Sequence, residues 1–228
     1  MKRAPLSVLL AALLGFAFPI SLVRASQPAA PPGAVASFQQ EDSLATLKTN
    51  EGVLFVWNLD DLHFSLAIKG REISPQSDPD HIFFSVDGRV LQIQAAAIKE
   101  FAPDAKERKL DDRAILAAHR DWEAKFIEGL LRSKLRLQTF NVKLSNGAEA
   151  LLWQFDMPEG TNADTFKQLY LTVVRGNFVV LINSEVTATN SEEDGRKFLL
   201  ETMATLKSSP TPIDVKALGE SIQKGNGP

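Results

Sequence analysis

The stretch Leu169–Val186, LYLTVVRGNFVVLINSEV, carries the strongest secondary-structure signal in the sequence. Gly176-Asn177 stands between two arms rich in Val, Leu and Ile, which is the pattern of a β-hairpin. The second arm opens with the apolar run Phe178–Ile182, so both faces of that strand are apolar. A strand of this kind is buried on both sides, and we therefore expect further layers on both faces of its sheet.

Three further hairpins are expected, over residues 53–69, 81–98 and 137–157. The second of these turns at Asp87-Gly88, a pair that favours the tight type I′ turn, and the third joins its two arms across Asn146-Gly147. In the first, apolar and other side chains alternate on both sides of Asp60-Asp61, which indicates strands with one apolar face.

Two helices are expected between and after these hairpins. Asp111 or Asp112 can cap a helix that reaches about Arg132 and carries apolar residues at helical spacing. Ser191 begins the last helix, with Asp194 three residues on as a capping box. The element order predicts an α+β fold, with an antiparallel sheet of about six to eight strands built from hairpins and covered by two main helices.

This order of elements resembles the PsbP-like α/β/α sandwich, a family that includes exported DcrB-like bacterial proteins. The resemblance covers about Val53–Lys207 and rests on the early hairpins, the mid-chain helix, LYLTVVRGNFVVLINSEV and the closing segment SEEDGRKFLLETMATLK. It implies an accessory or interaction role rather than catalysis. No binding residue of the family can be carried over to a position of this sequence.

The beginning of the chain has the pattern of a secretory signal peptide. Lys2 and Arg3 provide positive charge, Val8–Phe18 is apolar, and Ala25 is the small residue before the expected cleavage. An uncleaved membrane anchor is the alternative, but a spanning helix needs about 20 apolar residues and Pro19 interrupts this run. Cleavage after Ala25 would place the protein in the periplasm or outside the cell.

The sequence is expected to have four parts: a signal peptide (1–25), a flexible leader rich in Ala and Pro (26–40), a single α+β domain (41–207) and a disordered C-terminal tail (208–228). The tail is expected to be disordered because Pro and Gly are frequent in it and large apolar residues are few. A single helical turn around Val215–Ile222 is the most structure that we expect there.

Composition excludes several classes of function. There is no cysteine among the 228 residues, which excludes disulfides, thiolate metal sites, thiol nucleophiles and a lipid-modified cysteine. The net charge of −3 argues against a general nucleic-acid-binding protein, which would usually be basic.

The densest polar cluster is Asp78, Asp80 and His81, whose carboxylates and imidazole could bind a divalent metal ion. Asp60, Asp61 and His63 form a similar group in the first hairpin and could complete such a site. The alternative is ordinary turn chemistry, in which Asp side chains accept hydrogen bonds from their own loop. The sequence does not show whether the two loops meet.

His119 and Trp122 lie on the apolar stripe of the long helix and could line a ligand pocket against the sheet. The alternative is that both belong to the helix–sheet contact, with the imidazole hydrogen-bonded to a neighbour.

No known catalytic motif is present in the sequence. We therefore expect an exported, non-catalytic binding or accessory protein of the bacterial cell envelope, with no cofactor. An envelope protein is a possible partner, nucleic acid is not expected, and membrane contact is expected only through the signal peptide. The alternative is a divalent-metal- or small-ligand-binding protein that uses residues 78–81.

Overall fold

The computed structural model describes residues 43–59, 61–76, 82–161 and 164–225. The expected signal peptide and leader lie outside the described residues. The strands are β1 (Leu44–Thr49), β2 (Gly52–Leu59), β3 (Leu62–Lys69), β4 (Ile73–Gln76), β5 (Ile82–Val86), β6 (Arg89–Ala97), β7 (Gln138–Lys143), β8 (Glu149–Asp156), β9 (Thr165–Arg175), β10 (Phe178–Thr187) and β11 (Lys207–Ser209). The helices are α1 (Ile98–Phe101), α2 (Asp112–Leu131), α3 (Glu192–Ala204) and α4 (Val215–Gln223).

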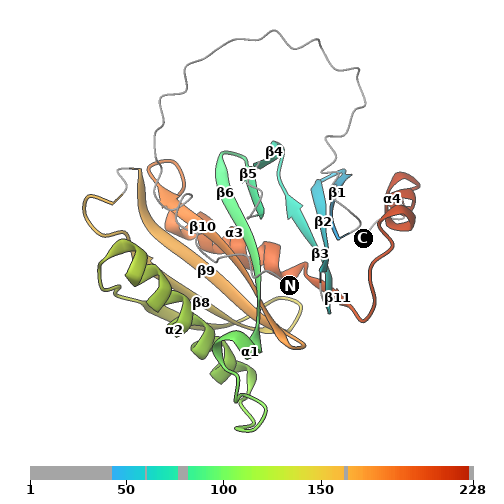
Figure 1. The fold of residues 1–228 in the computed structure, drawn as a ribbon. Coiled ribbons are helices and arrows are strands. Elements are labelled where there is room, and N and C mark those ends of the chain that lie inside the picture. Colours follow the sequence, from blue (N-terminus) through green and yellow to red (C-terminus); the bar gives the residue numbers. More distant parts are fainter. Residues whose placement is uncertain (1–42, 60, 77–81, 162–163, 226–228) are drawn as a thin grey trace.

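The strands form two sheets, and the paired strands are antiparallel throughout (Figure 1). The larger sheet has seven strands in the order β4-β5-β6-β10-β9-β8-β7, and the smaller has four in the order β1-β2-β3-β11. The predicted α+β class and antiparallel pairing are confirmed, and seven strands fall within the expected range. The smaller sheet was not expected as a separate layer, because alternation of side chains identifies strands without saying which sheet they join.

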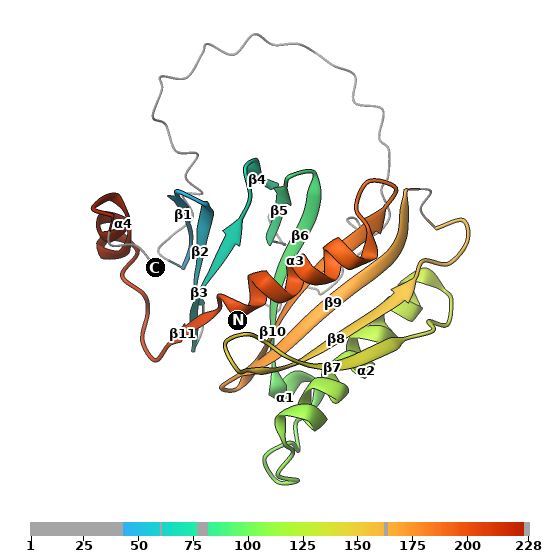
Figure 2. The ribbon, with the colours of Figure 1, turned by 180° about the vertical axis from the view of Figure 1, so that it is seen from behind.

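The larger sheet is covered on both faces. Helix α2 packs on β8 and β9, where its apolar residues meet Leu151, Trp153 and Tyr170. The other face packs against α3 and the smaller sheet around a second core that includes Phe64, Leu199 and Met203. Figure 2 shows α3 lying across this face and leading into β11 of the smaller sheet. The expectation from the apolar strand β10 is thus met by a helix on one side and by a helix plus a sheet on the other.

Both predicted helix caps are present. The Asp111 side chain accepts a hydrogen bond of 2.8 Å from the backbone N–H of Ala114. At α3 the backbone N–H of Asp194 donates to the Ser191 hydroxyl at 3.2 Å, and that hydroxyl donates to the Asp194 carboxylate at 2.6 Å. These contacts satisfy N–H groups that the first turn of a helix leaves without a backbone partner.

The prediction of a disordered tail is wrong for residues 208–225. They contain part of β11, which pairs with β3, and the helix α4, which packs near β1. The Asn58 side chain holds the segment between them: it donates to the Ile213 carbonyl at 2.9 Å and accepts from the Ile213 N–H at 2.8 Å. Composition failed here because the tail is ordered by residues about 150 positions away, which a local pattern does not contain.

Among the described helices, none is both long and apolar enough to cross a membrane.

Candidate functional site

The predicted metal site cannot be placed, because Asp78, Asp80, His81 and also Asp60 lie outside the described residues. Asp61 is exposed in the turn between β2 and β3, and His63 is half-buried in β3. Within the described ranges no three His, Cys, Asp or Glu side chains gather closely enough to hold a metal ion. The metal site stays a prediction.

The predicted pair His119 and Trp122 does come together on α2, with ring centroids 5.9 Å apart. Phe101 of α1 packs against both rings, at 5.0 Å from His119 and 6.1 Å from Trp122. The imidazole is 2% exposed and its Nδ1 has no hydrogen-bond partner. Burial lowers the pKa of His119 to about 4, so the ring is neutral at neutral pH.

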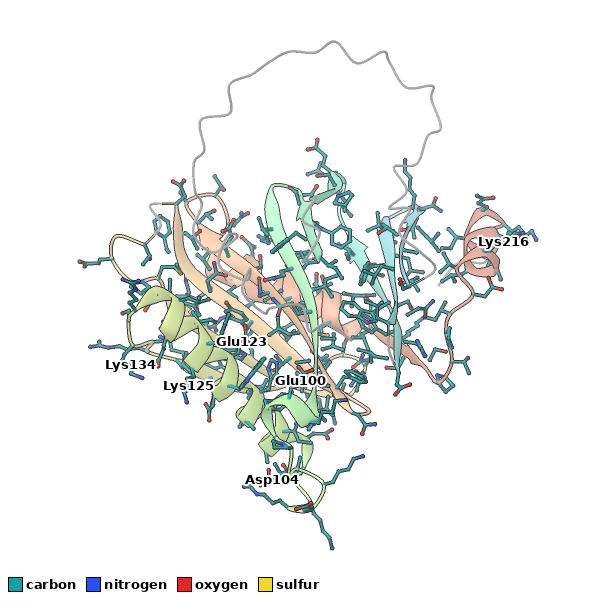
Figure 3. The ribbon with its side chains drawn as sticks, in the orientation of Figure 1. Glu100, Asp104, Glu123, Lys125, Lys134 and Lys216 are labelled. Atoms are coloured by element: carbon teal, nitrogen blue, oxygen red, sulfur yellow. The ribbon has the colours of Figure 1, made fainter. Side chains whose placement is uncertain are left out.

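Glu123 is a third member of this cluster that the sequence analysis missed. It lies one helical turn after His119, on the side of α2 that faces the larger sheet (Figure 3), and is 3% exposed. Its Oε1 has no hydrogen-bond partner, and burial raises the pKa of Glu123 to about 7. The sequence contained a signal for Glu123, because positions 119, 123 and 127 are spaced four residues apart and therefore lie along one helix face.

The sheet beneath this cluster is aromatic. Tyr170 and Trp153 stack across β9 and β8 with centroids 4.0 Å apart and planes 8° apart, and the Trp153 indole N–H is also without a partner. Burial raises the pKa of Tyr170, and the nearby Glu123 raises it further. A neutral imidazole and a carboxyl group that titrates near pH 7 could exchange protons with a substrate. Their small exposed fractions, however, leave no surface that a substrate could touch.

A pocket of about 660 Å³ lies on the opposite side of the larger sheet, between the edge strands β1 and β4 of the two sheets. We call it the inter-sheet pocket. It is lined by the β1–β2 turn, by the corner that joins β3 to β4, and by Asp87 in the β5–β6 turn. Its apolar lining is Val53, Ile73 and Pro75, of which Val53 and Ile73 pack against the core between the sheets.

Two glycines allow the walls of this pocket to meet. Gly52 has φ +151°, and a Cβ there would lie 2.1 Å from the Ile68 carbonyl oxygen. A Cβ on Gly70 would lie 2.8 Å from a methyl group of Val86. Since real side chains do not approach so closely, both positions require glycine if the turns are to pack as they do.

Asp87 fixes the corner between the two sheets. Its Oδ1 accepts hydrogen bonds from the backbone N–H groups of Arg71 at 3.1 Å and of Glu72 at 2.9 Å. Its own N–H donates to the Glu72 carbonyl at 2.8 Å. The predicted turn residue therefore also ties the β5–β6 turn of the larger sheet to the chain that enters from the smaller sheet.

The charged side chains around the pocket differ in whether they have a partner. The Glu51 carboxylate pairs with Lys69 at 2.5 Å, which holds the pKa of Glu51 below its usual value. The Asp87 carboxylate is occupied by the two backbone N–H groups. Lys48 and Arg71 also line the pocket, and neither has a carboxylate within ion-pair distance in the described part of the chain.

No protein-family model matches this chain, and no curated protein matches its sequence. Among solved structures, it is similar to the solution structure of the cyanobacterial PsbP protein (CyanoP) from Synechocystis. The two are 12% identical with a TM-score of 0.39, over 80% of this chain and 98% of that chain. The α+β class rests on the strand pairing described above, and membership of the PsbP-like family stays a prediction.

Proposed function

We propose that the protein is an exported, non-catalytic binding or accessory protein of the bacterial cell envelope, and that it holds a small ligand in the inter-sheet pocket. Export is supported by the signal-peptide pattern that ends at Ala25. The binding role has support from the fold, because the pocket lies where two independent sheets meet.

The observation that carries the proposal is the construction of the inter-sheet pocket. Its volume of about 660 Å³ lies within the range of roughly 300–1,000 Å³ that is common for small-molecule sites. Its walls depend on two glycine contacts and on the hydrogen bonds of Asp87. These contacts hold the three turns around the pocket in fixed positions, which suits a preformed binding site.

Binding fits this pocket better than catalysis does. The two side chains with acid–base character, His119 and Glu123, belong to the layer under α2 on the other face of the larger sheet. The lining of the pocket has Lys, Arg, Thr and Asn groups suited to holding a ligand, and of its two carboxylates Glu51 forms an ion pair with Lys69 while Asp87 accepts backbone hydrogen bonds.

A thermal-shift panel on residues 26–228 tests the binding role, with metals, sugars, nucleotides, amino acids and lipids as ligands. A ligand at about 100 times its dissociation constant adds about 2.7 kcal/mol to the free energy of unfolding. For a chain of this size that corresponds to a rise in Tm of roughly 5–10 °C.

A blocking variant shows whether a shift arises in the inter-sheet pocket. Thr46→Trp places a large ring in the lining from β1, and Thr139→Trp makes the same change on the exposed edge strand β7. A shift that Thr46→Trp abolishes and Thr139→Trp preserves supports the proposal. A flat panel, or a shift that neither variant changes, contradicts a ligand in this pocket.

Export is tested separately. The native protein purified from the periplasm or the medium is expected to begin at Ser26. A protein that retains residues 1–25 and fractionates with membranes would contradict cleavage and release.

The accessory form of the proposal has an envelope protein as partner in place of a small ligand. Crosslinking in the intact envelope tests it, with the chain truncated after Lys207 as the comparison, because β11 forms one edge of the smaller sheet and α4 packs near β1 at the other edge. Equal crosslinking by both chains would exclude the C-terminal segment from the contact.

A further inference from the structure

We infer that the inter-sheet pocket takes a small organic anion, with the acid group at Lys48 and Arg71 and the apolar body on Val53 and Ile73. This inference rests on the proposed function and names the chemical class of the ligand. It follows from the charges of the lining, from the position of its apolar groups and from the way in which the corner is held.

Two cations of the lining are available to an anion, and counted with Lys69 the pocket region has three cations against two carboxylates. Of the four ionisable side chains in the lining, Glu51 is paired with Lys69, and Asp87 accepts hydrogen bonds from the backbone. Lys48 and Arg71 are left without a carboxylate among the described residues. A carboxylate or phosphate group would supply the missing partner, and the planar guanidinium of arginine can bind either group through two parallel hydrogen bonds.

The apolar groups are placed deeper than the charges. Val53 and Ile73 are partly buried and pack against the core between the sheets, whereas Lys48 and Arg71 are exposed. A ligand that matches this arrangement keeps its acid group at the mouth and directs an apolar body inward. A lipid anchored in a membrane has the opposite constraint, because its apolar tails stay in the bilayer, so the fit is to a free molecule.

Arg71 is held in place through its backbone. Asp87 binds the N–H groups of residues 71 and 72, and Gly70 lets the chain turn against Val86. The base of the Arg71 side chain is thereby fixed at the mouth, while its guanidinium group is exposed and free to meet a ligand. Asp87 is thus a positioning residue for a binding group.

Calorimetric titration with four matched eight-carbon probes tests the inference: octanoate, octyl phosphate, n-octanol and n-octylamine. We expect the two anions to bind more tightly than the alcohol and the amine. An exposed ion pair changes an affinity by up to about fivefold, so the variant Lys48→Gln/Arg71→Gln should weaken octanoate binding by roughly tenfold. Higher salt should also weaken octanoate binding by the unmodified protein, because exposed charges are screened.

The control is Lys106→Gln/Lys125→Gln, which removes two exposed cations from outside the pocket. It should leave octanoate binding unchanged, and Thr46→Trp should abolish it. All of these positions are at least partly exposed, so the variants are expected to fold, which thermal unfolding verifies.

Three results would overturn the inference. Equal affinity for octanol and octanoate, unaffected by Lys48→Gln/Arg71→Gln, would show a site that does not select charge. Binding to vesicles of anionic phospholipid without binding to free octanoate or octyl phosphate would indicate a membrane surface instead. If neither anion binds but the broad panel finds a ligand that is sensitive to Thr46→Trp, the proposed function stands and the ligand class is wrong.

Discussion

His119 and Glu123 lie one turn apart on the buried side of α2, and burial shifts their pKa values in opposite directions. The pKa of His119 falls from 6.5 to about 4, and that of Glu123 rises from 4.5 to about 7. Each group is therefore uncharged in the folded protein under conditions in which the unfolded chain would carry the charge. Replacing one residue at a time should reveal a pH dependence of stability that the other conceals.

The signs follow from proton binding. Above pH 4.5 the unfolded chain loses the Glu123 proton while the folded protein keeps it to about pH 7, so stability falls as pH rises through this window. Below pH 6.5 the unfolded chain protonates His119 while the folded protein does not until about pH 4, so stability falls as pH drops. A pKa difference of about 2.5 corresponds to about 3 kcal/mol for each group.

Between pH 4.5 and 6.5 the two effects oppose each other, so this pair contributes little net slope in the unmodified protein. Glu123→Gln should lose about 2 kcal/mol of unfolding free energy on acidification across this window, relative to the double variant Glu123→Gln/His119→Asn. His119→Asn should lose a similar amount as pH rises. Tyr170, the other titratable group that faces Glu123, stays protonated throughout because its pKa is raised.

Urea unfolding at several pH values, followed by tryptophan fluorescence, measures these slopes. The double variant serves as the baseline, since all other titrating groups are common to the four proteins. If Glu123→Gln and the unmodified protein have the same pH profile, Glu123 ionises at its ordinary pKa. Water would then reach this layer, and the interpretation of the cluster as closed would be wrong.

Three further predictions concern the turns and the C-terminal segment. Gly52→Ala should lower the unfolding free energy by about 2–4 kcal/mol, because the new Cβ would meet the Ile68 carbonyl oxygen at 2.1 Å. The control is Gly147→Ala, at a glycine that also has positive φ but has open space around it. This control should cost about 1 kcal/mol in the same denaturant titration. Asp87→Ala should lower the unfolding free energy by about 1–3 kcal/mol and weaken octanoate binding, since two backbone N–H groups lose their acceptor. The control Asp61→Ala, at an exposed position, should change neither quantity. Unchanged octanoate binding by Asp87→Ala would refute the positioning role of Asp87. Asn58→Ala should release α4, which would appear as a loss of hydrogen-exchange protection at residues 213–223 while β9 and β10 stay protected. If residues 213–223 also stay protected, packing on β1 alone holds the helix.

Local signals in the sequence were sufficient for the hairpins and the helix caps. Asp87-Gly88 specifies a tight turn through its own backbone preference, and Asp111 and Ser191 cap helices through bonds to residues three positions away. Strands β1 and β11, by contrast, were not identified. Each is ordered by pairing with a partner strand in the smaller sheet, and for β11 that partner is β3, far back along the chain.

The candidate site was less accessible to sequence reasoning than the fold. His119 and Trp122 were found because helical spacing places both on one face, and the same spacing would have identified Glu123. The inter-sheet pocket has no comparable pattern, because its lining comes from three separate turns. From the sequence, Gly70 indicates only a turn. The structure shows that a side chain there would meet Val86, which the sequence does not reveal.

Asp87 shows how a local requirement and a long-range one can be met by one residue. Its φ of +49° suits the hairpin turn, a conformation that Asn and Asp tolerate better than most residues. The turn alone would accept Asn or Gly equally well. A side-chain oxygen is what the corner needs, because it accepts hydrogen bonds from the backbone N–H groups of Arg71 and Glu72. The choice of Asp over Gly at this turn is therefore explained by the junction of the two sheets and not by the hairpin.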